Sequence, residues 1–180
     1  RYVKKTISKL KSIHYLFKKV EGINDKCDQL VSTEHGILVA STNGLYVIKD
    51  EKAEQIISNR YIHQISKKTP ENTYYISSSI GFFTVSYQND EWRIGNNFVN
   101  FAEPVYSVNY LNKSEVWLGG ENKTYSFSLD SLGEATNLKS YHVDTRFPEQ
   151  YKLDYVNDTL YLFLESGLFF FDQDLDSFKL

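Results

Sequence analysis

Methionine is absent from this sequence of 180 residues, and cysteine occurs only once, at Cys27. A single cysteine excludes an intrachain disulfide and the paired-cysteine spacing of zinc and redox motifs. The four histidines lack the paired spacing of a zinc-binding helix, and no Gly-x-Ser-x-Gly nucleophile motif is present. No apolar run approaches the roughly 20 residues that a membrane-spanning helix needs. The sequence therefore predicts no catalytic residue, no metal site and no cofactor in this chain.

Proline is also scarce, with three residues, whereas 14 Tyr and 12 Phe bring the aromatic share to 16%. Aromatic residues favour strands, so this composition is typical of a β-sheet protein rather than of a helical or disordered one. The net charge of −3 argues against general binding of nucleic acid, and we expect no such partner. Because the first residue is Arg1, we interpret the chain as a processed form or an excised piece, whose missing targeting signals are uninformative.

One hairpin pattern recurs along the chain: an apolar strand, a small polar turn and a second apolar strand. Its four copies span residues 37–48, 74–85, 116–127 and 160–171. The turns end at Gly44, Gly81, Lys123 and Gly167, which lie 37, 42 and 44 residues apart. A period near 40 residues, with strands in each unit, is typical of a β-propeller in which each repeat forms one blade.

The strands of this hairpin are apolar on both faces, as in the run Val116-Trp117-Leu118. Such strands must be covered on both sides, which happens when a blade lies between two neighbouring blades. A two-layer sandwich is the alternative, but it predicts a cleaner alternation of apolar and polar residues. We therefore predict an all-β fold, a β-propeller segment of about four four-stranded antiparallel blades plus part of a preceding blade.

The repeat also predicts the boundaries of the units. The partial blade takes residues 1–25, with short strands at 13–18 and 19–21, and the four blades take 26–58, 59–95, 96–138 and 139–180. Four and a half blades close a ring poorly. We therefore expect a segment of a larger propeller, or self-association with another copy through propeller or blade edges.

Ligand-binding residues are expected in the connections from the last strand of one blade to the first strand of the next, because loops on a rigid scaffold carry binding. The candidates are Arg60, Tyr61, Asn97, Phe98, Arg146 and Phe147. An arginine beside an exposed aromatic suits a sugar or a carboxylate, because the ring stacks and the guanidinium binds in a fork. Alternatively, these rings fill gaps between blades and the arginines bind loop carbonyl groups.

Two stretches, Glu21-Gly22-Ile23-Asn24-Asp25 and the run from Gly36 to Ile48, together resemble the two-component regulator propeller repeat. That family has an E-G-L-x-x-N entry and a G-x-[IL]-W-[IV]-G-T strand. Here Leu38 stands where tryptophan is usual, and Ala40-Ser41-Thr42 replaces the G-T end. Residues 21–48 match well, whereas the later units keep the hairpin and lose the entry motif.

The resemblance implies the sensor region of a bacterial signalling receptor, on the extracytoplasmic side of the membrane. It implies an oligosaccharide or another small extracellular ligand, and a membrane span and a kinase or DNA-binding output in other parts of such receptors. Our first hypothesis is therefore a non-catalytic, ligand-sensing propeller. The alternatives are a scaffold for protein–protein interaction and a propeller-type carbohydrate-active enzyme, whose paired carboxylates would converge at the channel mouth.

Overall fold

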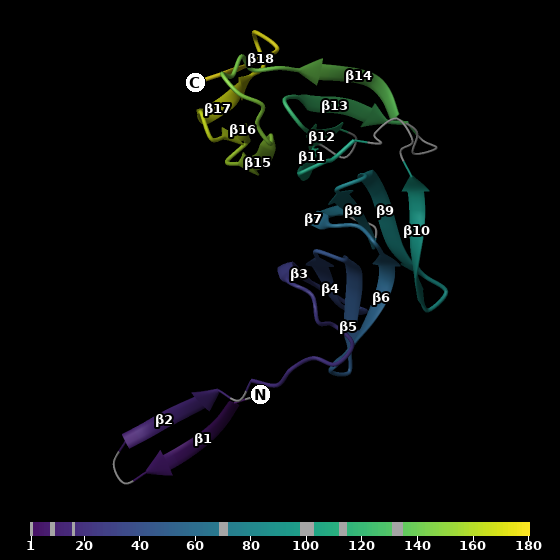
Figure 1. Ribbon diagram of the computed structural model, residues 1–180, viewed down its shortest axis with the longest axis vertical. Coiled ribbons are helices and arrows are strands. Elements are labelled where there is room, and N and C mark those ends of the chain that lie inside the picture. The colour runs from purple at the N-terminus through teal and green to yellow at the C-terminus, as the bar shows by residue number, and fades with distance from the viewer. Residues whose placement is uncertain are drawn as a thin grey trace.

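The computed structural model describes residues 2–7, 10–15, 17–68, 72–97, 103–111, 115–130 and 135–180, and these contain strands and no helix. Side chains are described for these ranges except residues 2–15, 67, 68, 96 and 97. Four four-stranded antiparallel sheets follow one another around a common centre as the blades of a β-propeller (Figure 1). The predicted all-β propeller is thus confirmed.

Each blade is one sheet whose strands pair in chain order. Blade 1 contains β3 (Cys27–Thr33), β4 (Gly36–Ser41), β5 (Gly44–Lys49) and β6 (Lys52–Ser58). Blade 2 contains β7 (Ile62–Lys68), β8 (Thr73–Ser78), β9 (Gly81–Gln88) and β10 (Glu91–Asn97). Blade 3 contains β11 (Ser107–Leu111), β12 (Glu115–Gly119), β13 (Thr124–Leu129) and β14 (Ala135–Tyr141). Blade 4 contains β15 (Lys152–Val156), β16 (Thr159–Leu164), β17 (Gly167–Asp172) and β18 (Ser177–Lys179).

The segment before blade 1 differs from its prediction. Strands β1 (Tyr2–Ile7) and β2 (Leu10–Tyr15) pair with each other, and Figure 1 shows this hairpin apart from the four blades. The strand predicted at 13–18 ends earlier, because residues 17–20 are not in a strand. The strand predicted at 19–21 is reduced to one parallel bridge between Glu21 and Lys52 at the outer strand of blade 1.

The tight turns of the repeated hairpin depend on backbone conformations that favour glycine. Gly44 has a φ of +152°, and a Cβ atom there would lie 2.0 Å from the carbonyl oxygen of Ile57. Blade 3 has no glycine at Lys123, and its turn instead places Asn122 in the left-handed region, with a φ of +61°. Asparagine tolerates this region better than most residues, so the turn persists without the glycine.

Three hydrophobic cores lie between successive blades. The first joins blades 1 and 2, the second joins blades 2 and 3, and the third joins blades 3 and 4. Strand β12 contributes to two of them, because Val116 and Leu118 belong to the second core while Trp117 belongs to the third. Burial of both faces of one strand is what separates a blade from a sandwich layer, so the sandwich alternative is wrong.

The innermost strands, β3, β7, β11 and β15, are tied by side chains that bind the backbone of the next blade. Gln29 of β3 donates from Nε2 to the Ile65 carbonyl (3.0 Å) and accepts the Ile65 N–H at Oε1 (2.7 Å). Gln64 of β7 accepts the Val108 N–H at 2.7 Å. We call each such contact an inter-blade cap.

The cap between blades 3 and 4 uses two side chains. Ser107 Oγ accepts the N–H of Leu153 at 2.8 Å, and Asn109 Nδ2 donates to the Leu153 carbonyl at 2.9 Å. The inner strands are not paired as a sheet, so these caps satisfy backbone groups that would otherwise stay unbonded. The caps therefore fix the register of each inner strand relative to the inner strand of the next blade.

Candidate ligand-binding site

Two successive blades carry a β-bulge at the start of their inner strand. In blade 1 the pairing moves from Cys27–Ser41 to Gln29–Ala40, which leaves Asp28 as the extra residue. In blade 2 it moves from Ile62–Ser78 to Gln64–Ser77, which leaves His63 as the extra residue. A bulge turns a side chain away from the alternation of its strand, and bulges are frequent beside active sites. Asp28 and His63 thus occupy equivalent positions at the inner ends of adjacent blades.

These two residues belong to a row of contacts that crosses three blades. Lys26 Nζ lies 2.8 Å from Asp28 Oδ1, and the Tyr61 hydroxyl donates to Asp28 Oδ2. The Tyr61 and His63 ring centroids are 4.4 Å apart, and those of His63 and Tyr106 are 5.0 Å apart. We call Lys26, Asp28, Tyr61, His63 and Tyr106 the inner-strand cluster.

Electrostatics sets the protonation states in this cluster. The hydrogen bond from Lys26, followed by that from Tyr61, lowers the pKa of Asp28 below its ordinary value. The hydrogen bond to Asp28, followed by burial, raises the pKa of Tyr61. Burial, followed by the charge of Lys152, lowers the pKa of His63. At neutral pH the cluster therefore presents a carboxylate, an ammonium group and a neutral imidazole.

His63 has an unused polar atom. Its Nε2 atom is buried and has no hydrogen-bond partner within the described part of the chain. A buried polar atom without a partner costs about 1–3 kcal/mol, so such atoms are unusual in a stable fold. The cluster can bind polar groups by hydrogen bonds and rings by stacking, since it combines charged groups with three aromatic rings.

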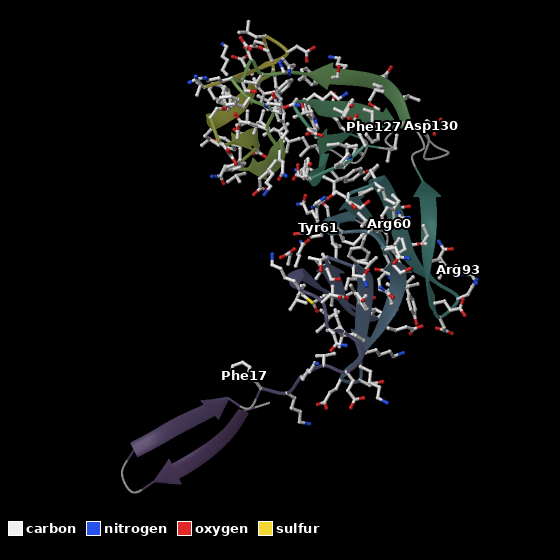
Figure 2. All side chains as sticks on the ribbon, in the orientation of Figure 1. Phe17, Arg60, Tyr61, Arg93, Phe127 and Asp130 are labelled. Atoms are coloured by element: carbon white, nitrogen blue, oxygen red, sulfur yellow. The ribbon has the colours of Figure 1, made fainter. Side chains whose placement is uncertain are left out.

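Tyr61 is the predicted ligand residue that the structure places in this cluster. Its neighbour Arg60 points elsewhere, with its guanidinium carbon 5.3 Å from the centroid of the Phe83 ring, and Figure 2 shows both residues. The Arg60 Nε atom is buried and has no hydrogen-bond partner among the described residues. Arg60 thus packs over a ring of blade 2 and lies outside the inner-strand cluster.

The other predicted residues are not joined to the cluster by any contact of the described residues. Arg146 and Phe147 lie together in the connection to blade 4, with the guanidinium carbon 5.2 Å from the ring centroid. The Phe147 ring is well exposed. Asn97 ends β10, but its side chain and the whole of Phe98 lie outside the described residues.

Sequence reasoning missed Lys26, Asp28, His63 and Tyr106. A usable signal was the shared order in Cys27-Asp28-Gln29-Leu30 and Ile62-His63-Gln64-Ile65, where a titratable residue precedes a glutamine at the same place in two repeats. The bulge itself has no such signal, because it depends on pairing with the next strand. The strand alternation alone would have given Asp28 and His63 ordinary positions in the sheet.

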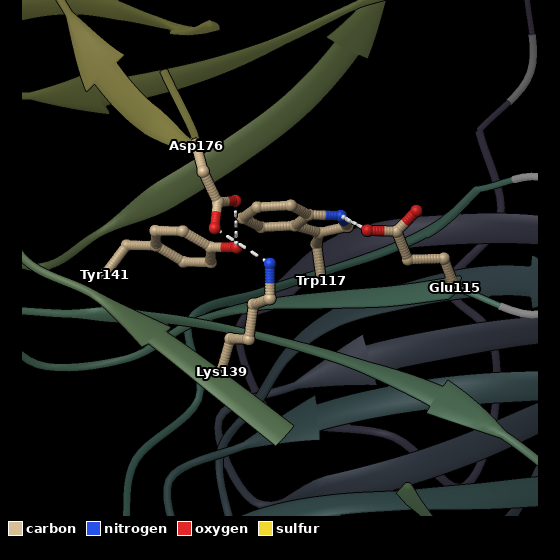
Figure 3. A network of polar contacts seen from close by, with 5 residues as sticks. All are labelled: Glu115, Trp117, Lys139, Tyr141 and Asp176. Atoms are coloured by element: carbon tan, nitrogen blue, oxygen red, sulfur yellow. Dashed lines mark hydrogen bonds and ion pairs between the residues drawn. The ribbon is translucent and has the colours of Figure 1, made fainter. Parts of the chain in front are cut away.

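A second polar network joins blades 3 and 4 (Figure 3). Asp176 binds Lys139 Nζ and the Tyr141 hydroxyl, each at 2.8 Å, and these bonds lower the pKa of Asp176. Glu115 accepts the Trp117 Nε1–H at 2.8 Å. Both carboxylates are therefore occupied by protein donors, and the bonds of Asp176 hold the β17–β18 turn against blade 3.

A cavity of about 580 Å³ lies at the opposite end of the inner strands, between β6 and the β9–β10 turn. His35 and Tyr87 stack over it with ring centroids 3.7 Å apart, and Trp92 completes its aromatic wall. The described residues contain no group of three or more His, Cys, Asp or Glu side chains placed to hold a metal ion. They also contain no helix that is long and apolar enough to cross a membrane.

No family model and no curated protein matches this sequence. Among the solved structures that are similar in fold, two are of the extracellular domain of BT4673 from B. thetaiotaomicron. One, described as a hybrid two-component system, has a TM-score of 0.69 and 20% identity. The alignment covers 86% of this chain and 21% of the other chain. The other, described as a one-component system, has a TM-score of 0.70 and 20% identity and aligns with 89% and 22%. This chain therefore spans about a fifth of the length of those proteins and shares their propeller fold.

Proposed function

We propose that this chain is part of the ligand-sensing propeller of a bacterial signalling receptor, that it lies outside the cytoplasm, and that it is non-catalytic. The observation that carries the proposal is the inner-strand cluster, in which equivalent bulges place Asp28 and His63 at the inner ends of two adjacent blades. The similarity of the fold to extracellular domains of a two-component system supports the proposed location outside the cytoplasm in a signalling receptor. In such receptors the membrane is reached through parts outside this chain.

The ligand class that suits the cluster is an oligosaccharide or another small polar molecule. Tyr61 and Tyr106 offer rings for stacking, while Asp28 and Lys26 offer an acceptor and a donor for hydroxyl groups. A ligand bound here would touch three blades at once. It would signal by favouring one arrangement of those blades over another, because only differential binding shifts a conformational equilibrium.

Titration calorimetry with a panel of neutral and acidic oligosaccharides tests the proposal. We expect binding without turnover, weakened by at least about tenfold in Asp28→Ala, because a hydrogen bond to a charged group contributes about 1.5–3 kcal/mol. Tyr106→Ala is also expected to weaken binding, because it removes a ring for stacking. Asp144→Ala is the matched control, since Asp144 is exposed in the connection between blades 3 and 4. Cleavage of a saccharide would favour the enzyme alternative. Equal binding by all variants would show that the inner-strand cluster is not the binding site.

A protein-interaction scaffold is the second candidate, because blades 1 and 4 expose large apolar side chains such as Leu30 and Leu168. Monomeric proteins seldom expose contiguous apolar patches on a sheet face. The scaffold predicts that no small molecule binds and that a protein partner binds tightly, with affinity lost in Leu30→Lys and unchanged in Asp28→Ala.

A further inference from the structure

The cavity of about 580 Å³ between β6 of blade 1 and the β9–β10 turn of blade 2 is lined by no residue of the inner-strand cluster, and we call it the outer cavity. The pairing of β5 with β6 builds its blade 1 wall. Val47 packs in the first core toward blade 2 and pairs with Glu54. Lys49, two residues further along β5, pairs with Lys52. Alternate residues of a strand and paired residues of two strands share a face, so these three charged side chains face blade 2.

The blade 2 wall of the outer cavity is aromatic. Val85 packs in the first core toward blade 1, and Tyr87, two residues further along β9, pairs with Trp92 of β10. The rings of Tyr87 and Trp92 therefore face blade 1, with centroids 5.4 Å apart and an interplanar angle of 68°. His35 of blade 1 stacks on Tyr87. The outer cavity thus has an aromatic wall and a charged wall, and an aromatic wall suits a flat ring.

The interface between blades 3 and 4 shows how the protein closes the equivalent place with its own side chains. Asp176 immediately precedes β18 and Asp90 immediately precedes β10, and both have positive φ values, +48° and +61°. Asp176 binds Lys139 and Tyr141 of blade 3 (Figure 3), and the cavity that these three residues help to line has a volume of about 160 Å³. Asp90 makes no hydrogen bond or ion pair with a described residue of blade 1. The place that is bridged between blades 3 and 4 is therefore open between blades 1 and 2.

Several polar groups around the outer cavity lack partners. The Trp92 Nε1 atom is buried without a hydrogen-bond partner in the described part of the chain, whereas Trp117 at the bridged interface donates to Glu115. Four charged side chains of the cavity have no ion-pair partner within the described ranges: Lys49, Lys52, Glu54 and Asp90. A simple cation or a simple anion would meet like charges here. A molecule with one charge of each sign would find an opposite charge for both.

We propose that the outer cavity binds a small zwitterion that carries a flat ring, for which an aromatic amino acid is the simplest probe. The ring lies against Tyr87 and Trp92, the carboxylate of the ligand faces the two lysines, and its ammonium group faces the two unpaired carboxylates. The cavity volume is within the range of about 300–1,000 Å³ that small-molecule sites have. Such a ligand joins blades 1 and 2 as Asp176 joins blades 3 and 4, and its binding is independent of the inner-strand cluster.

Titration calorimetry of the complete 180-residue chain with L-phenylalanine tests the ligand class. Three related probes each lack one feature: L-alanine lacks the ring, N-acetyl-L-phenylalanine lacks the ammonium group, and L-phenylalaninamide lacks the carboxylate. We expect L-alanine to bind at least about tenfold more weakly, the range of one buried ring. The other two probes are expected to bind at least about threefold more weakly, the range of two exposed ion pairs. Absence of L-phenylalanine binding, or equal binding of any of the three related probes, would overturn the proposal.

The two tryptophans of the chain report where the probe binds. Each indole N–H gives one peak in a nitrogen–proton correlation spectrum, and Trp92→Phe identifies the peak of Trp92. L-phenylalanine is expected to shift the Trp92 peak and to leave the Trp117 peak in place, because Trp117 lies between blades 3 and 4. A shift of the Trp117 peak alone, or of neither peak, would place the probe outside the outer cavity and would contradict the proposal.

Charge-neutralising variants test the two polar contacts. Asp90→Asn and Lys52→Gln are each expected to weaken binding of L-phenylalanine by about two- to fivefold, the range of one exposed ion pair. Asparagine tolerates the positive φ of Asp90, so the turn is retained. Asp158→Asn is the matched control, since Asp158 is exposed in a turn of blade 4 and has the same φ of +61°.

Asp28→Ala separates this proposal from the proposed function. It removes a residue of the inner-strand cluster, so L-phenylalanine is expected to bind this variant as it binds the unchanged chain. Loss of L-phenylalanine binding in Asp28→Ala, or unchanged binding in both Asp90→Asn and Lys52→Gln, would remove the outer cavity as the site. Circular dichroism and thermal melting confirm that each variant is folded.

Discussion

At the scale of single residues, neighbours in the chain have different roles because the bulges change which side chains meet. Tyr61 binds Asp28 of the preceding blade, whereas Arg60 packs over Phe83 within its own blade. The sequence motif of an arginine beside an aromatic residue pointed to the connection that holds Tyr61. It could not separate the two residues, because their different contacts, Phe83 for Arg60 and Asp28 for Tyr61, depend on tertiary packing that a local motif does not encode.

Acid sensitivity is expected to arise from His63. Burial lowers the pKa of His63 in the folded chain below its ordinary value of 6.5. As the pH falls through about 6.5, the unfolded chain binds the proton first, so stability decreases on acidification. His63→Gln is expected to flatten the dependence of the urea midpoint on pH between 7 and 5. A steeper dependence in His63→Gln would contradict this assignment.

At the scale of strands, the repeat pattern predicted the four hairpins, because their apolar residues and glycine turns are local signals. The inter-blade caps were not predictable in this way. Gln29 and Gln64 look like ordinary polar residues of a half-exposed strand, and their partners lie 36 and 44 residues away. Before blade 1 the predicted strand bounds were wrong, because β2 ends at Tyr15 and residues 17–20 are not in a strand.

Loss of a cap is expected to destabilise the fold. Gln29→Ala removes both hydrogen bonds to Ile65 and leaves a buried N–H and carbonyl unpaired, so we expect a loss of about 1–3 kcal/mol in the free energy of unfolding. Urea denaturation measures it. Gln88→Ala is the control, since Gln88 is exposed and bonds only to Ser86, and its effect is expected to stay within about 0.5 kcal/mol. Equal losses in both variants would argue against the cap.

At the scale of the molecule, stability is divided among interfaces between blades. Alternate residues of one strand enter different cores, as Val116 and Trp117 show. That feature was predictable, because a strand that is apolar on both faces needs a neighbour on each side. The candidate site was not, because it is assembled from residues at or just before the starts of three inner strands. Repeat arrays of this kind respond to a mutation mainly at the interface it affects.

Truncation of Trp117 is expected to loosen one interface and spare another. Its ring packs 5.1 Å from Tyr141 and 4.7 Å from Phe171, so Trp117→Ala is expected to cost about 3–5 kcal/mol. Hydrogen exchange should accelerate in blade 4 and stay slow in blades 1 and 2. Phe147→Ala, at an exposed ring, should leave the exchange pattern unchanged. Uniform acceleration across all blades would show instead that the array unfolds as one cooperative unit.

The caps all run in one direction, from an earlier blade to a later one. During synthesis the amino-terminal part of a chain leaves the ribosome first and starts folding first. Each blade that has folded therefore displays the oxygen atom that the next inner strand needs, before that strand has emerged. The order of translation and the order of assembly therefore coincide, and each new blade packs against a blade that has already folded.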